Sequence, residues 1–148
     1  MAVIQNNFPD EITKGYPGME ADGELSNIIT RTLESSSVGF GKAVYQGAGD
    51  RGAVTTPSAN LLGFTIKNPF LPITSARPAD TFAQGDNLRI KNRGKIWVTV
   101  ASDVTPRAPV YVTATGEITA TSGGNQAATG WEFDDTAKSG AVARIVRR

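Results

Sequence analysis

Two similar stretches of sequence decide the fold class: LRIKNRGKIWV, residues 88–98, and VYVTATGEITA, residues 110–120. When they are aligned, apolar residues alternate with polar ones in both, and Gly94 coincides with Gly116. Alternation with a period of two is typical of half-buried strands, and glycine supplies the positive φ that a tight turn needs. The repeat therefore predicts two β-hairpins and an antiparallel β protein.

The remaining sequence adds short strands that are separated by turn signals. Isoleucine and threonine in 27–33 favour a strand over a short helix. Loops rich in glycine, proline or small polar residues are predicted over 46–60, 68–78 and 121–130. About eight short strands with turns every eight to twelve residues are typical of an antiparallel β-sandwich or a jelly-roll-like barrel, and this all-β fold is our prediction. The further predicted strands cover 38–45, 61–67, 131–133 and 141–146.

The first 24 residues differ in composition from the rest of the chain. They hold five acidic residues and one basic residue, and Pro9, Pro17 and several glycines interrupt any helix. We predict an extended N-terminal arm over 1–24 and a single β domain over 25–148. The arm either packs on its own domain or reaches a neighbouring subunit. Its apolar side chains are the predicted protein contacts: Val3, Ile4, Phe8, Ile12, Tyr16 and Met19.

The composition excludes several kinds of site. The chain has no cysteine and no histidine, so disulfides, thiolate metal sites and imidazole chemistry are ruled out, and we expect neither a metal nor a cofactor. A formal net charge of +1 argues against bulk binding of nucleic acid. No apolar run is long enough to cross a membrane. The start lacks the features of a secretory signal, so we expect synthesis in a cytoplasm.

A glycine-rich motif and a run of basic residues each have a functional and a structural interpretation. GAGDRG, residues 47–52, matches the dinucleotide pattern G-x-G-x-x-G, but no helix signal follows and 65–79 lack the acid that would hold a ribose. We interpret the motif as a surface loop. The basic residues form either a positive stripe for phosphate or an acidic partner, or a solvated strand face that protects an edge, and we favour the second. These alternating residues are Arg89, Lys91, Arg93 and Lys95.

Trp97 lies on the opposite strand face from Ile96 and Val98. It could stack a nucleic-acid base, fill a subunit interface or be buried between two covered faces, and we favour an interface or the core. The alternative to a purely structural role is a binding module, either a fibre or adhesin or an oligonucleotide-binding barrel that uses Trp97 with Arg89 and Lys91. No local carboxylate pair and no serine with a base indicates catalysis, so we predict that the protein is not an enzyme.

Several segments between residues 25 and 146 together resemble the structural cement, or decoration, proteins of tailed-phage heads. They are ITRTLESSSVGFGKAV (29–44), LGFTI (62–66), FAQGDNLRI (82–90), GKIWV (94–98), PVYV (109–112) with Gly116, and the end over 137–145. The resemblance implies a β-rich homo-oligomer, a dimer or trimer, on the outer surface of the virion, where it clamps neighbouring subunits of the major capsid protein. It implies no catalytic residue and no binding of nucleic acid, membrane or a small molecule.

Overall fold

The computed structural model describes residues 14–148, which form eleven strands and no α-helix. The predicted all-β class is therefore confirmed. Nothing helical in this part of the chain is long or apolar enough to cross a membrane. The strands are β1 (Asn27–Leu33), β2 (Ser37–Gly39), β3 (Ala43–Gln46), β4 (Gly52–Val54), β5 (Leu61–Thr65), β6 (Thr81–Ala83), β7 (Asn87–Thr99), β8 (Pro109–Val112), β9 (Ile118–Thr119), β10 (Gln126–Phe133) and β11 (Val142–Arg147).

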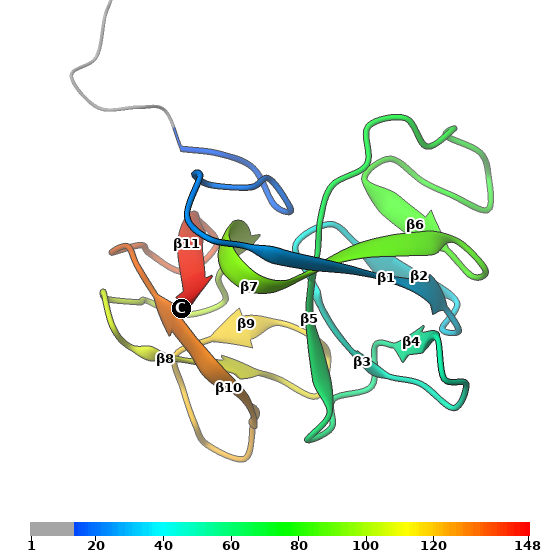
Figure 1. Cartoon of the computed structure of the whole chain (residues 1–148). Coiled ribbons are helices and arrows are strands. Elements are labelled where there is room, and N and C mark those ends of the chain that lie inside the picture. Colours follow the sequence, from blue (N-terminus) through cyan, green and yellow to red (C-terminus); the bar gives the residue numbers. More distant parts are fainter. Residues whose placement is uncertain (1–13) are drawn as a thin grey trace, which may run out of the picture.

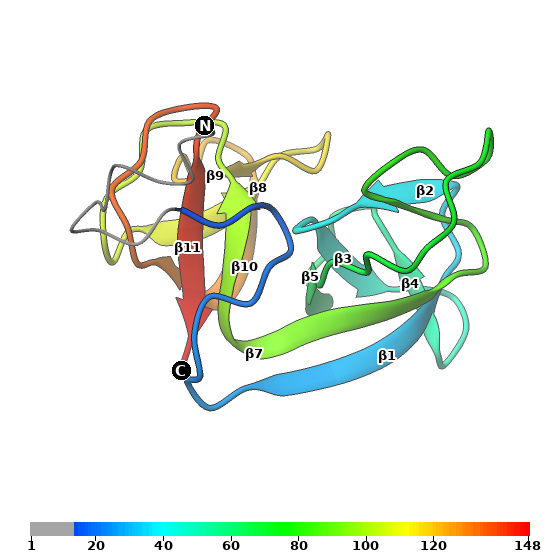
Figure 2. The same cartoon turned by 90° about the horizontal axis from the view of Figure 1, so that it is seen from above.

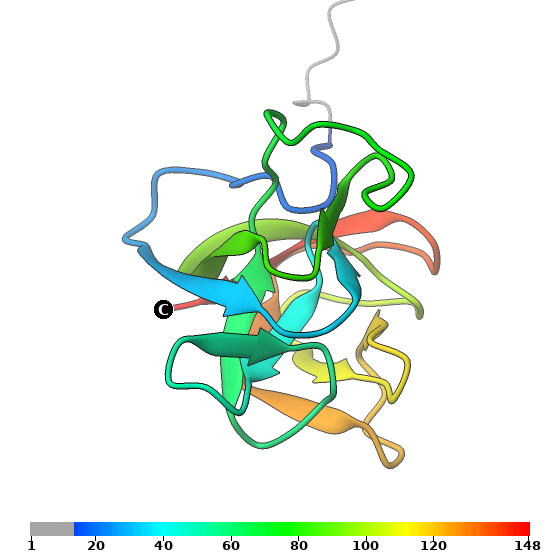
Figure 3. The ribbon, with the colours of Figure 1, turned by 90° about the vertical axis from the view of Figure 1, so that its right-hand side faces the viewer.

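The strands form two lobes that share β7 (Figures 1 and 2). In the barrel lobe, which faces the viewer in Figure 3, the order β1-β4-β3-β5-β7 closes on itself because β7 also pairs with β1. In the second lobe β7 continues into the order β11-β10-β8-β9, while β2 and β6 form a separate small sheet. The strand pairs are antiparallel apart from β1 and β4, which run parallel. The predicted barrel is thus confirmed, with further strands extending from it.

β7 is the stretch predicted as the first hairpin, and that prediction is wrong. The strand does not reverse: it pairs with β1 and β5 before Gly94 and with β11 from Gly94 onward. Gly94 has a φ of 108°, and a Cβ there would lie 2.8 Å from the Cβ of Ser26. The glycine permits a bend within one strand instead of a turn between two. The second hairpin is confirmed, because β8 and β9 pair around a turn in which Gly116 has a φ of 82°.

The other predicted boundaries hold in part. The strand over 27–33 and the loop over 68–78 are confirmed. The single strand predicted over 38–45 is in fact β2 and β3, because Gly41, with a φ of 67°, turns the chain between them. The predicted loops 46–60 and 121–130 contain β4 and the first part of β10. These strands gain hydrogen bonds from distant partners, which local composition does not reveal.

Two apolar clusters lie on opposite sides of the barrel wall. One fills the barrel and includes Val44 and Leu88. The other lies between the barrel and the second lobe, where the rings of Phe64 and Trp131 meet edge to face with their centroids 4.9 Å apart. Val44 and the adjacent Tyr45 belong to different clusters, so β3 is buried on both faces. Burying a large apolar side chain stabilises a fold by roughly 1.5–3 kcal/mol, and the shared wall therefore couples the two lobes.

We expect Gly94→Ala to destabilise the fold, because alanine at a φ of 108° is strained and its methyl group would meet Ser26. The expected loss in the free energy of unfolding, measured by urea denaturation, is about 1–3 kcal/mol. Gly123→Ala is the matched control, because a Cβ on this exposed glycine would have its nearest neighbour at 3.8 Å. The control should change stability by less than about 0.5 kcal/mol; equal losses in both variants would contradict the bend.

Candidate functional site

Residues 14–24, which belong to the predicted arm, lie along the edge of β7 opposite β11, and we call them the strap (blue in Figure 2). The backbone N–H of Gly18 donates to the carbonyl of Trp97, and the N–H of Trp97 donates to the carbonyl of Met19, both at 2.9 Å. On the barrel side, the N–H of Lys67 donates to the carbonyl of Gly18 at 2.9 Å. The strap is therefore hydrogen-bonded to both lobes.

Trp97 is covered by the strap. The residue is 8% exposed, and a Cβ on Gly15 would lie 2.5 Å from its Cδ1 atom. The guanidinium of Arg144 lies 5.5 Å from the centroid of the ring. Ile96 and Val98 belong to the apolar cluster on the other face of β7. In this chain Trp97 therefore makes an intramolecular contact, and its predicted contact with another protein stays a prediction.

The other predicted contact residues lie at or before the strap. Tyr16 is 46% exposed, with the ammonium of Lys67 4.3 Å from the centroid of its ring. Met19 is half-buried. The strap thus brings Tyr16, Met19 and Trp97 to the same side of the molecule. The remaining four residues lie outside the described part of the chain: Val3, Ile4, Phe8 and Ile12.

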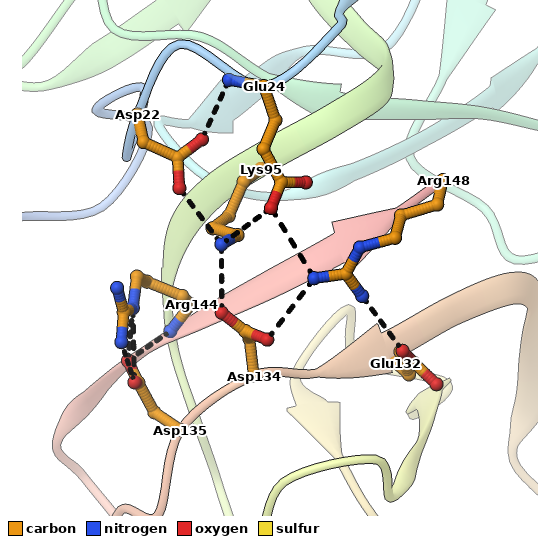
Figure 4. Close-up of polar contacts among 8 residues, drawn as sticks. All are labelled: Asp22, Glu24, Lys95, Glu132, Asp134, Asp135, Arg144 and Arg148. Atoms are coloured by element: carbon orange, nitrogen blue, oxygen red, sulfur yellow. Dashed lines mark hydrogen bonds and ion pairs between the residues drawn. The ribbon is translucent and has the colours of Figure 1, made fainter.

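Two lysines of β7 are buried under the strap, which contradicts the predicted solvated strand face. Lys91 is 1% exposed and pairs with Glu20. The Nζ of Lys95 lies 2.9 Å from Asp22, 3.0 Å from Glu24 and 2.9 Å from Asp134 (Figure 4). Burying an ammonium is costly unless carboxylates surround it. The excess of acids in the arm therefore supplies the partners of these lysines.

The ion pair between Lys95 and Asp22 shifts the pKa values of these two groups in opposite directions. Burial alone would lower the pKa of Lys95, but its bonds to Asp22, Asp134 and Glu24 raise it above its usual value. The hydrogen bond from Lys95 lowers the pKa of Asp22. Both groups are consequently held in their charged forms. Arg148 also joins this network, with its Nη2 atom 3.4 Å from Oε1 of Glu24.

Three aspartates, Asp86, Asp134 and Asp135, are bound by basic side chains. Asp135 accepts hydrogen bonds from Arg144, including one from Nε at 2.9 Å, and Asp86 accepts one from Nε of Arg77 at 2.8 Å. Asp134 is part of the Lys95 network. Within residues 14–148 no group of three or more acidic side chains is arranged to hold a metal ion. These aspartates are thus engaged in ion pairs within the chain.

The glycine motif of residues 47–52 surrounds a carboxylate of its own chain. Glu34 accepts hydrogen bonds from the backbone N–H groups of Ala48 and Gly49, both at 2.9 Å. A Cβ on Gly52 would lie 1.8 Å from Oε1 of Glu34. The glycines thus make room for an internal anion, and the interpretation as a surface loop is confirmed. Sequence analysis missed Glu34, because nothing near it in the sequence marks its partner.

The loop between β5 and β6 carries exposed apolar side chains that sequence analysis also missed. Phe70 is 91% exposed and Ile73 is 74% exposed. The loop is held by Arg77, whose side chain binds Asp86 and whose Nη1 lies 3.5 Å from the carbonyl of Pro72. A signal was available, because apolar residues stand beside prolines in a stretch that cannot form a central strand. Exposed apolar side chains gathered in one place are typical of interaction surfaces.

We expect substitutions at Glu34 and at Gly52 to remove one and the same interaction. Glu34→Ala removes the carboxylate, and Gly52→Ala displaces it, so each should lower the free energy of unfolding by about 1–2 kcal/mol. The double variant should lose little more than either single variant, because both remove the same interaction. Urea unfolding of all four proteins measures this. Fully additive losses would mean that Glu34 and the loop act independently.

We also expect acid to destabilise the fold through the strap. A carboxylate whose folded-state pKa is lowered, as in Asp22, stabilises the fold above its unfolded pKa, and that stability is lost as the pH falls through the folded pKa. The urea midpoint should therefore fall between about pH 5 and pH 2, and less steeply in Asp22→Asn. Asp50→Asn, which changes an exposed carboxylate in the β3–β4 loop, should keep the wild-type slope. Identical slopes in all three proteins would exclude Asp22 as a contributor.

Comparisons with known proteins agree with this architecture. No curated protein sequence matches the chain. The chain is similar to a solved structure described as the capsid of Myoviridae phage XM1, with a TM-score of 0.72 and 18% identity over 97% of this chain and 96% of that chain. This likeness shows a shared fold. A structure of the head fibre gp8.5 N base of bacteriophage phi29 gives a TM-score of 0.49 and 13% identity, over 84% of this chain and 95% of that chain.

A family profile matches almost the whole chain. The family is described as structural cement protein (E217 gp24/Pam3 gp6), and the match covers residues 4–148. The resemblance inferred from the sequence segments is thereby confirmed. The protein belongs to the family of phage structural cement proteins.

Proposed function

We propose that this non-enzymatic capsid protein binds the outer surface of a phage head and bridges neighbouring subunits of the major capsid protein. The family match over residues 4–148 carries this proposal. A cement protein acts through contact area, and the described residues suit that task. Carboxylates such as Asp86 and Asp135 are bound by basic side chains, whereas apolar side chains such as Phe70 are left exposed.

The apolar residues of the arm are the proposed anchors across subunit seams. Gly15 lies against Trp97 and Gly18 is hydrogen-bonded to it, so the segment that follows residues 1–13 is held beside β7. A fixed starting point reduces the conformational entropy that binding would otherwise cost. A homo-dimer or trimer would add avidity, because one bound copy raises the effective concentration of the next. The proposed anchors are Val3, Ile4, Phe8, Ile12, Tyr16 and Met19.

The oligonucleotide-binding alternative is not favoured. It required Trp97 to present its ring beside Arg89 and Lys91. Trp97 lies under Gly15, and Lys91 is 1% exposed and paired with Glu20. Arg89 alone of the three is exposed. An aromatic ring covered by its own chain cannot stack a base, and the family match does not support the fibre or adhesin form of this alternative.

The test is co-sedimentation with empty shells of the major capsid protein from the same genome. We expect the full chain to bind saturably and a variant lacking residues 1–13 to bind at least about tenfold more weakly, because each buried apolar anchor is worth roughly 1.5–3 kcal/mol. This deletion leaves the strap, and hence the cover of Trp97, intact.

Two sets of substitutions refine the same measurement. Replacing Val3, Ile4 and Phe8 together by serine should reproduce the effect of the deletion. Replacing the polar residues Gln5, Asn6 and Asn7 together by alanine should leave binding unchanged. If the deletion variant binds shells as tightly as the full chain, residues 1–13 do not anchor the protein. If the full chain does not bind shells, the protein does not bridge the capsid subunits.

A further inference from the structure

We infer that a cleft between the strap and the β5–β6 loop receives the N-terminal segment, residues 1–13, of a neighbouring copy of this chain. The inference rests on the proposed function, since it names the partner surface of the arm within a decorated shell. It adds a contact between copies to the proposed contact with the capsid. The cleft, its charge and the direction of the strap carry the argument.

The cleft has two connected parts. The larger has a volume of about 470 Å³ and is lined by Tyr16, Pro17, Phe40 and Asp80, among others. The smaller has a volume of about 90 Å³ and shares Phe40 and Asp80 with the first, while the β5–β6 loop forms its far wall. The two parts of this groove are therefore neighbours, one on the side of the strap and one on the side of the loop, with Phe40 and Asp80 common to their linings. Apolar residues of that loop line the smaller part: Leu71, Ile73 and Pro78.

The loop side of the groove is held in place before anything binds. Thr74 and Arg77 exchange backbone hydrogen bonds of 2.9 and 3.1 Å, which close a turn at the tip. The side chain of Arg77 is fixed by Asp86. Phe70 and Ile73 nevertheless remain 91% and 74% exposed. A surface that is ordered yet leaves large apolar side chains in water is suited to a partner that covers them.

Residues 1–13 match this surface in chemistry. Their sequence, MAVIQNNFPDEIT, contains apolar side chains at Val3, Ile4 and Phe8, followed after one proline by Asp10 and Glu11. Beside Tyr16, which lines the groove, lies the ammonium of Lys67, 4.3 Å from the centroid of the ring, whereas the acid Asp80 lines both parts of the groove. An apolar segment with adjacent acids can bury Phe8 in the groove and place its carboxylates near that ammonium. A proline in the segment keeps it extended, as a groove ligand needs to be.

The direction of the strap shows where residues 1–13 join the described part of the chain. Gly15 lies over Trp97, which pairs with Arg144 of β11, whereas Gly18 lies against Phe40 of the barrel lobe. From Gly15 to Gly18 the chain thus runs from the side of β11 toward the barrel lobe, as the first part of the blue segment does in Figure 2. The described chain thus enters this run at Lys14, one residue before Gly15 and its contact with Trp97.

A link of this kind joins unlike surfaces of two copies. Such a heterologous contact closes into a ring when the rotation between copies permits it, and otherwise continues as an open array. Either arrangement suits a protein that covers a shell in many copies. In both, each copy donates one segment and accepts another.

Single-cysteine variants test the link, because the chain has no cysteine of its own. Asn7→Cys, beside Phe8, is mixed with Ala79→Cys, which lines the groove and is exposed. One variant carries a tag so that the mixed dimer is resolved on a non-reducing gel. We expect the mixed disulfide to form at least about fivefold more than with the control Ser122→Cys, an exposed residue of the second lobe. The mixtures are oxidised both in solution and on shells.

Further variants show whether the groove holds the arm of a neighbouring copy or the arm of the same chain. Adding Phe8→Asp to Asn7→Cys should reduce the mixed dimer to the control level. The double variant with Asn7→Cys and Ala79→Cys should form dimers and longer ladders; a monomer closed by an internal disulfide would place the arm in its own groove and overturn the inference. Control-level yields both in solution and on shells would also overturn it. If the deletion of 1–13 still weakens shell binding in that case, the proposed function survives and the link between copies does not.

Discussion

Because β7 pairs with β1 and β5 before Gly94 and with β11 after it, neither lobe is complete without the other. A single strand that serves two sheets must change direction between them, and the positive φ of Gly94 allows that change. The bend also leaves one edge of the second half of β7 without a strand of the main sheet. The strap fills that edge with backbone hydrogen bonds, so an open edge that would invite pairing with other chains is closed.

The electrostatics of the strap follow from this geometry. Lys91 and Lys95 stand on the part of β7 that the strap covers, and covering an ammonium without a partner would cost several kcal/mol. The strap supplies Glu20, Asp22 and Glu24 at the positions where these ammonium groups lie. The same residues thus close the sheet edge and neutralise the charges beneath. This explains why an acidic arm lies next to a strand rich in basic residues.

Local pattern predicted those elements whose structure depends on neighbours in sequence. The strand over 27–33, the hairpin around Gly116 and the proline-rich loop all behave as their residues indicate. The stretch around Gly94 could not be resolved in this way, because a bend and a turn both need glycine at positive φ. The burial of Lys91 depends on Glu20, which is 71 positions away, and the exposure of Phe70 depends on how its loop is held. For the same reason the glycine motif resembled a phosphate loop, although Glu34 already occupies it.

A protein that holds a shell together must present the same surface each time it binds. Here backbone hydrogen bonds hold the strap against β7, and the Arg77 contact holds the exposed loop. With no histidine in the chain, no side chain has an ordinary pKa near neutrality. The network moves the pKa values of Asp22 and Lys95 further from neutrality, because Lys95 lowers the pKa of Asp22 while its acidic partners raise the pKa of Lys95. The ion pair of Lys95 with Asp22 therefore keeps its charges over the whole neutral range, and the strap that it holds stays over β7.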